Sequence, residues 1–503
     1  MPRYALKKLL LWTAGCWLLL LAHRLFFAIV QYPRDDAAAT PPGTGEMLLQ
    51  LLRGLQYDFA SLPIPLAPLI VALPGYALLS RPHGPAHRLL QSLELFQWAW
   101  VGFLQLLLFA STYNFSFNNK HLGWELYAYF DDAGTLLAGA LQDQPLLFVL
   151  FCLSLPVFIV PGYYWIFRRA RPPAGSETTF PRQIAAAVAL EIIVIAFIAI
   201  GVRGGLQDNP LRSPDAIRSD SAYLNNLPLN GVFTASRDAR DRGDFIQYFA
   251  SDQNIQHVRE LLGGEFLSED YPLLRHMPAR APYGERPNIV FVILESFTAK
   301  YLEAHGGDPR IAPNFNQLTK EGLYFQRFMA SGGRSSNGLF CMLAGLPDRA
   351  NRTILRSNEA QNRMGGLAHL LEAKGYSSLF THGGDLRFDS LDRILPHLGF
   401  QTTIGYRKMR KAGVAGELTP YGYHDGVTFR VSLEHINELR QPFFAAVFTV
   451  NTHHPYMIPN QDFAFFGADV EQNAFLNSYR YSDLLSCEFF HAEIDLRLCD
   501  ILL

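Results

Sequence analysis

The chain has 503 residues, with 43 Lys and Arg against 45 Asp and Glu, so its formal net charge is −2. This length exceeds the roughly 100–200 residues of one domain, and a near-neutral charge excludes a bulk electrostatic attraction to nucleic acid. Long apolar runs with few charges end at about residue 205, and the remainder is mixed and polar, as in a soluble domain.

Five apolar runs within residues 1–205 are long enough to cross a bilayer, which takes about 20 mainly apolar residues. Lys7 and Lys8 precede the first run, as in a signal peptide. The run is longer than the roughly 7–15 apolar residues of such a peptide, so we interpret it as an anchor. The sequence therefore predicts an α-helical membrane domain over residues 1–205, with five transmembrane helices at Leu9–Ile29, Phe59–Leu79, Leu90–Phe109, Leu146–Phe167 and Ile184–Val202.

The orientation of these spans follows from the basic residues in the short loops, which stay in the cytoplasm. The basic flanks all fall on one side of the predicted spans, and they contain Arg3, Lys7, Lys8, Arg81, Arg88, Arg168, Arg169, Arg171 and Arg182. Five spans then place everything after Val202 outside. We expect a multi-pass protein of the bacterial inner membrane with a periplasmic C-terminal domain.

Two charged residues lie inside or beside the predicted spans. Arg24 is near the outer end of the first span, and Asp58 begins the second span from the same side. They either extend separately to the membrane surface or pair with each other, since charges within a membrane seldom remain single.

Residues 206–285 are polar with scattered helical patterns, and four prolines follow one another between residues 272 and 287. This composition predicts a juxtamembrane helical linker that sets the next domain against the bilayer.

The segment Asn288–Phe297 (NIVFVILESF) is the most informative in the chain. Its apolar run predicts a strand buried on both faces of a parallel sheet, and Glu295 follows directly. Ligands collect at the carboxyl ends of such strands, and a buried ionised Glu needs a cation or hydrogen-bond donors. The alternative is a Glu that only caps the following turn.

A second strand is expected at Tyr324–Met329, followed by Gly332-Gly333-Arg334-Ser335 and an apolar run typical of a helix. Glycines, a hydroxyl and then a helix would expose the Ser335 Oγ at a helix N-terminus, which favours an alkoxide or a bound phosphate. The alternative is a serine that caps a helix after a flexible loop.

Polar groups also follow two further predicted strands. Tyr376–Thr381 ends in His382-Gly383-Gly384-Asp385, and Phe443–Val450 ends in Asn451-Thr452-His453-His454-Pro455. Ligand-capable residues that end one buried strand after another belong to the same edge of a parallel sheet. The sequence therefore predicts a functional site at this edge.

These motifs resemble the lipoteichoic acid synthase family, whose relatives include membrane phosphoglycerol and phosphoethanolamine transferases. The segments that carry the resemblance are N-I-V-F-V-I-L-E-S-F, G-R-S-S-N-G, H-G-G-D-L-R-F-D and N-T-H-H-P-Y after five spans. The resemblance implies an α/β alkaline phosphatase/sulfatase-like domain at residues 286–503. It also implies that Glu295 is a metal ligand, that Ser335 binds the metal and attacks phosphorus, and that His453 is a substrate-site histidine. By position, Arg334 is assigned to the phosphate, and Asp385 and Asp389 to substrate binding.

The family completes its metal site with an Asp-His pair at the end of a late strand, and no Asp-His dipeptide occurs in this sequence. Because residues 491–503 also depart from the family pattern, we expect a catalytic domain that is incomplete at its C-terminus and leaves a sheet edge uncovered. The expected cofactor is Mn²⁺ or Zn²⁺, with Mg²⁺ as a further candidate, on Glu295 and Ser335. The alternative is that His491 and Asp495 act as substitute ligands.

The leading hypothesis is a metal-dependent phosphotransferase that moves the phosphoglycerol or phosphoethanolamine head group of a phospholipid donor to a periplasmic glycan or lipid acceptor. We expect its activity to be impaired in this chain. The alternatives are a sulfate or phosphate ester hydrolase and an inactive membrane remnant. Cys341 lacks the C-x-P-x-R context of true sulfatases, which argues against the first alternative.

Overall fold

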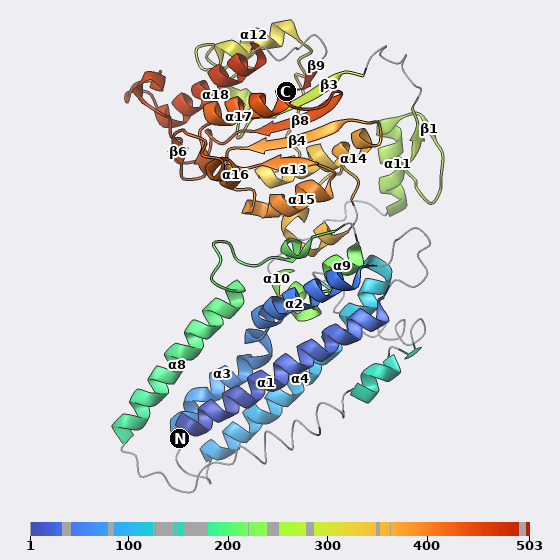
Figure 1. Cartoon of the computed structure of the whole chain (residues 1–503), viewed down its shortest axis with the longest axis vertical. Coiled ribbons are helices and arrows are strands. Elements are labelled where there is room, and N and C mark those ends of the chain that lie inside the picture. Colours follow the sequence, from blue (N-terminus) through green and yellow to red (C-terminus); the bar gives the residue numbers. More distant parts are fainter. Residues whose placement is uncertain are drawn as a thin grey trace.

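The computed structural model describes residues 2–32, 42–78, 85–123, 180–219, 221–238, 251–277, 286–348, 353–362, 364–491 and 499–502, together with short parts of 126–160. Long helices form one end of the molecule, and a sheet covered by helices forms the other (Figure 1). Short helices lie between these two parts.

The membrane part contains helices α1 (Pro2–Val30), α2 (Thr44–Ser61), α3 (Pro63–Leu78), α4 (Pro85–Asn118) and α8 (Phe180–Arg203). Within the described residues, 4 segments are long and apolar enough to cross a membrane: Ala5–Val30, Thr44–Leu73, Ser92–Asn118 and Ile184–Arg203. They agree with four of the five predicted spans, and the predicted span at residues 146–167 lies mostly outside the described residues. The second span begins earlier than expected, at Thr44, because α2 and α3 follow each other with Pro63 as the first residue of α3.

Arg24 and Asp58 pair with each other inside this helical part, which confirms the pairing alternative and excludes separate extension to the surface. Arg24 Nε donates to Asp58 Oδ2 at 3.3 Å, and a second contact joins Arg24 Nη2 to Asp58 Oδ1. Arg24 also donates to the carbonyl oxygens of Gly54 and Leu227, each at 2.8 Å. Asn230 Nδ2 donates to Asp58 Oδ1 at 3.1 Å. This network ties α1 and α2 to the segment that follows the last span.

That segment begins with 3₁₀ helix η2 (Ser213–Ala216), α9 (Ala222–Asn226) and α10 (Gly231–Asp238), and continues with α11 (Ser251–Leu262) and the hairpin β1 (Glu265–Phe266) and β2 (Arg275–His276). Its first part packs on the membrane helices, since Tyr223 Oη donates to Ala28 O at 2.8 Å and Thr234 Oγ1 to Leu122 O at 2.6 Å. The segment is therefore docked on the membrane part over α9 and α10.

The second part of the chain is built on a five-stranded sheet in the order β5-β4-β8-β3-β9, with every pair parallel. The strands are β3 (Asn288–Ile293), β4 (Ser377–His382), β5 (Thr402–Ile404), β8 (Phe443–Phe448) and β9 (Cys499–Leu502). All six residues of the central strand β8 are buried. Along β3, Val290 and Val292 face one core, and Ile289 and Phe291 face the other, as the two-residue period of a strand requires.

Helices cover both faces of this sheet (Figure 1). One core contains residues of α13 (Ser335–Ala344), α14 (Leu367–Glu372) and α15 (Leu391–His397), and the other contains residues of α16 (Tyr406–Lys411), α17 (Asp425–Asn437) and α18 (Asn473–His491). The remaining elements are η3 (Ala299–Tyr301), η4 (Glu303–His305), α12 (Pro313–Glu321), η5 (Ile354–Arg356), η6 (Asn358–Gln361), η7 (Phe388–Ser390), β6 (Leu418–Thr419), β7 (Gly422–Tyr423) and η8 (Gln461–Phe463).

One expectation about the sheet is wrong. Residues 324–329 form no strand, and Phe328 and Met329 are exposed. Gln326 and Arg327 interrupt the apolar residues there, so the segment lacks the continuous apolar run of a strand that is buried on both faces. β9 lies at the edge of the described sheet and pairs in register with β3, from Asn288↔Cys499 to Phe291↔Leu502. The expectation that the domain is incomplete at its C-terminus stays a prediction.

Candidate active site at the carboxyl ends of the strands

Glu295 lies two residues beyond the end of β3, in a turn that is fixed by the neighbouring strand. Its backbone N–H donates to Thr449 Oγ1 at 2.8 Å, and its carbonyl oxygen accepts a hydrogen bond from Thr452 Oγ1. Ser296 adopts a left-handed backbone (φ 51°) and donates from its Oγ to Glu295 Oε1 at 2.8 Å. Both threonines follow β8 and fix the Glu295 backbone, so β3 and β8 together position Glu295, a residue that is 8% exposed.

The Ser335 side chain contacts the Glu295 carboxylate directly. Its Oγ donates to Glu295, with 2.7 Å to Oε2 and 3.0 Å to Oε1. Ser335 is the first residue of α13, so the positive end of the helix dipole is directed at the pair. A Cβ on Gly332 would lie 2.4 Å from Asn337 Cβ, which explains why the loop before the helix needs glycine there. The structure therefore brings together the two residues that the motifs single out, 40 positions apart.

His453 and Arg334 are exposed, and each directly neighbours a residue of this site in the sequence. His453 follows Thr452, which contacts Glu295, and its ring lies 3.9 Å from the Tyr421 ring between centroids. Its Nδ1 is 3.0 Å from His454 O. Arg334 immediately precedes Ser335, and its side chain is exposed. The roles of both residues in binding a substrate stay predictions.

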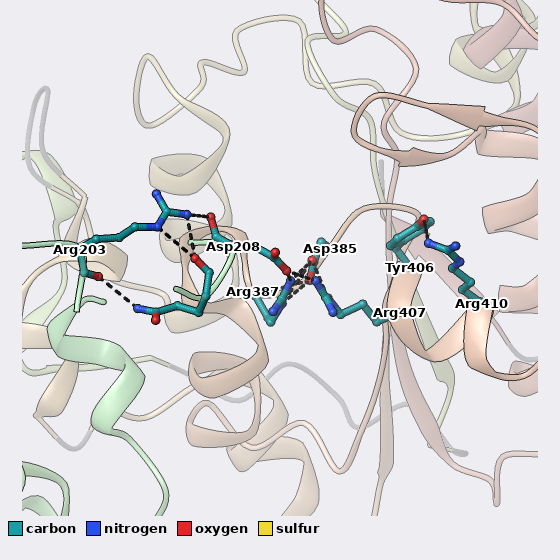
Figure 2. Close-up of polar contacts among 8 residues, drawn as sticks. Arg203, Asp208, Asp385, Arg387, Tyr406, Arg407 and Arg410 are labelled. Atoms are coloured by element: carbon teal, nitrogen blue, oxygen red, sulfur yellow. Dashed lines mark hydrogen bonds and ion pairs between the residues drawn. The ribbon is translucent and has the colours of Figure 1, made fainter. Parts of the chain in front are cut away.

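Asp385 and Asp389 have arginine partners instead of contacts with Glu295 or Ser335. Asp385 Oδ2 lies 3.0 Å from Arg387 Nη2 and 2.8 Å from Arg407 Nε (Figure 2). Asp389 contacts Arg356, and its Oδ1 lies 3.4 Å from Arg212 Nη1. The Arg212 contact joins the part of the chain that is built on the five-stranded sheet, called the catalytic part below, to the segment after the last span. The assignment of the two aspartates to substrate binding stays a prediction.

Asp425 is a site residue that the motifs did not reveal. It is fully buried at the start of α17, where its Oδ1 accepts hydrogen bonds from the backbone N–H of Val450 (2.7 Å) and Asn451 (3.1 Å). Its Oδ2 accepts one from Ser482 Oγ at 2.7 Å. Burial raises its pKa to about 6, and the negative charge of Glu295 adds to the rise. Asp425 therefore fixes the turn after β8 by accepting hydrogen bonds from its backbone, and its charge interacts with that of Glu295.

The residues that the structure describes contain no group of three or more His, Cys, Asp or Glu side chains that could hold a metal ion. Glu295 and Ser335 contribute two oxygen donors, whereas a catalytic zinc normally has three protein ligands and an open position. The described donor set thus does not by itself fit a catalytic zinc.

Comparison with known proteins gives a consistent group of relatives. Residues 287–488 match the sulfatase family. Lipoteichoic acid synthase 2 of Bacillus subtilis is 26% identical over 217 residues, which are 41% of this chain and 32% of that protein. Phosphoglycerol transferase I of Xanthomonas euvesicatoria is 26% identical over 187 residues, 35% of this chain and 26% of that protein. The chain thus aligns with about a third or less of the length of these two proteins.

Among solved structures, a protein of the alkaline phosphatase superfamily from Vibrio parahaemolyticus is similar with a TM-score of 0.43 and 26% identity. The similarity covers 48% of this chain and 59% of that one.

Proposed function

We propose, from the premise that this chain belongs to the lipoteichoic acid synthase-like family of the alkaline phosphatase/sulfatase superfamily, that it transfers a phospholipid head group to an acceptor hydroxyl. The observation that carries the proposal is the 2.7 Å hydrogen bond from Ser335 Oγ to Glu295 Oε2 at the carboxyl edge of the sheet. A hydroxyl held by a carboxylate at a helix N-terminus is arranged as a nucleophile toward an electrophilic phosphorus.

The reaction proceeds in two displacements. Ser335 Oγ attacks the phosphorus of the donor, a new O–P bond forms, and the bond from phosphorus to the diacylglycerol oxygen breaks. The Ser335 proton passes to a base, and diacylglycerol leaves with a proton. The hydroxyl of a periplasmic glycan or lipid acceptor then attacks phosphorus in the Ser335 phosphodiester. The bond from phosphorus to Ser335 Oγ breaks, the head-group phosphate passes to the acceptor, and the proton that the acceptor loses restores the Ser335 hydroxyl.

The neighbouring residues have separate parts in this proposal. Glu295 orients the Ser335 hydroxyl, as its two contacts of 2.7 and 3.0 Å indicate. Arg334 binds the phosphate oxygens, and His453 orients or supplies the proton of the leaving group or acceptor. A divalent metal, Mn²⁺, Zn²⁺ or Mg²⁺, stays a prediction that requires ligands in addition to Glu295 and Ser335, and it would neutralise charge on the phosphate. Because the described residues supply only two ligands for the metal, the two displacements are written without a metal.

The proposal is tested with a phospholipid that carries a label in its head group. The protein in membranes is incubated with labelled phosphatidylglycerol and, separately, with labelled phosphatidylethanolamine. One of these donors should release diacylglycerol and place an equal amount of label on a glycan or lipid acceptor. Appearance of the label only as free glycerol phosphate or ethanolamine phosphate would contradict transfer and support the hydrolase alternative.

We also propose that the catalytic part is periplasmic, because the basic loops fall on the other side of the predicted spans. An alkaline phosphatase reporter fused after Gly264, in the exposed hairpin segment, should therefore be active. A reporter that is active only when it is fused within residues 168–182 would reverse the topology.

A further inference from the structure

Two arginines of the catalytic part meet on one carboxylate oxygen that comes from the membrane side (Figure 2). Arg387 Nη2 lies 2.7 Å and Arg407 Nη2 lies 2.6 Å from Asp208 Oδ2. Asp385 holds both guanidinium groups in place, at 3.0 Å from Arg387 and 2.8 Å from Arg407. The two arginines are therefore preorganised to bind one anionic oxygen with charge-assisted hydrogen bonds.

Asp208 is the replaceable member of this cluster. Its side chain is 70% exposed, against 28% for Asp385. Ion pairs with so exposed a carboxylate contribute little to stability, so a competing anion can take the place of Asp208 at low cost. Asp385 would remain and would keep the arginines in position.

The cluster lies where the last membrane helix ends. Arg203 is the final residue of α8, and its Nη2 donates to Gln207 O at 2.8 Å and also to Asp208 O (Figure 2). The side chain of Arg203, the last residue of the candidate span Ile184–Arg203, therefore contacts the backbone of Asp208 directly. Phospholipid phosphates occupy the polar layer just outside the hydrocarbon core, at this level.

The cluster also lies on the catalytic edge of the sheet. Arg387 follows β4 and Arg407 lies in α16 after β5, whereas Glu295 follows β3. Because these strands are parallel, all three residues come from the carboxyl edge. Lys408, Arg410 and Lys411 are exposed on α16 beside Arg407, and this six-residue helix contains no acidic residue. An anion at the arginine pair is therefore met by a positive surface.

We propose that Arg387 and Arg407 form a binding site for the phosphate group of an anionic phospholipid at the membrane surface, and that Asp208 holds this site until a lipid phosphate replaces it. The site is separate from Ser335 and lies between the bilayer and the catalytic residues on the same edge. The inference rests on the proposed function only for what happens to the lipid afterwards, since binding requires no turnover.

The test measures lipid binding by the full chain in a neutral detergent, with native mass spectrometry. Phosphatidylglycerol should bind more tightly than phosphatidylcholine, and inorganic phosphate alone should not compete at equal concentration. Arg387→Gln and Arg407→Gln should each weaken phosphatidylglycerol binding roughly fivefold, as expected for one basic residue at an anionic lipid surface. Arg430→Gln is the matched control, because Arg430 is an exposed arginine paired with Glu434, and it should leave binding unchanged.

Asp208→Asn should increase the affinity for phosphatidylglycerol, because the competing carboxylate is removed. This variant is the decisive one, since a misfolded protein would not gain affinity. Unchanged or weaker binding in Asp208→Asn, or undiminished binding in the double arginine variant, would overturn the proposal. Equal competition by inorganic phosphate would also overturn it, since the site would then not be specific for a lipid. Lipid binding as expected without any head-group transfer would contradict the proposed function and leave this inference standing.

Discussion

Replacing Ser335 with alanine is expected to lower the rate of head-group transfer by roughly 10⁴- to 10⁶-fold, the range found when the nucleophile of a covalent mechanism is removed. The physical reason is that Ser335 Oγ supplies the bond to phosphorus and is the group held 2.7 Å from Glu295 Oε2. The rate is measured as diacylglycerol released from a head-group-labelled phospholipid. The helix α13 should remain folded, because the side chain of Ser335 is exposed and lies at its first position.

A matched control separates this effect from a general disturbance of the loop. Ser331 is an exposed serine four residues earlier in the same loop, and Ser331→Ala should leave the rate within about twofold. Transfer that persists at near-normal rate in Ser335→Ala would mean that another residue or the acceptor itself attacks phosphorus.

Replacing Arg24 with methionine is expected to destabilise the protein by roughly 3–5 kcal/mol, the usual effect of removing one partner of a buried ion pair. The Asp58 carboxylate is fully buried, and it would keep only neutral donors such as Asn230 Nδ2 at 3.1 Å. The carbonyl oxygens of Gly54 and Leu227 would lose their donor as well. The free energy of unfolding is measured by denaturant titration of the protein in detergent.

The double variant Arg24→Met, Asp58→Leu should recover much of this loss, because no uncompensated charge remains in the apolar interior. The control is Arg430→Ala, which breaks an exposed pair with Glu434 and should cost at most about 1 kcal/mol. A double variant as unstable as the sum of its single variants would contradict this explanation and assign the loss to packing.

The contacts that could be predicted from the sequence are those of charged or nucleophilic residues for which the sequence offers few possible partners. Arg24 and Asp58 lie at the ends of adjacent spans on one side, and charges within a membrane seldom remain single, so pairing is one of the two arrangements that the sequence allows. The structure selects this arrangement. Glu295 follows a buried strand of a parallel sheet, and Ser335 begins a helix after a glycine-containing loop, so both motifs indicate a site. Their contact confirms the expected meeting of the two residues, although no strand directly precedes Ser335.

Other features depend on three-dimensional packing that no local pattern encodes. Asp425 lies in an ordinary helix-start context, and its contact with the backbone after β8 arises because α17 packs beside that strand. Residues 324–329 are rich in aromatic side chains, as strands often are, but they lie outside the sheet, whose order is β5-β4-β8-β3-β9. The arginine partners of Asp385 and Asp389 come from positions as distant as Arg212, which only the docking of the two parts brings close.

The most direct test of the central claim is detection of the covalent intermediate on Ser335. The protein is mixed with a head-group-labelled phospholipid, quenched with acid and digested with trypsin, which releases Ser335 in the peptide of residues 335–349. Our account predicts that this peptide gains the mass of the phosphorylated head group, with fragment ions that place it on Ser335, and that Ser335→Ala shows no such gain. A preparation that transfers the head group while the label is attached to another residue, or to no residue at all, would contradict the account.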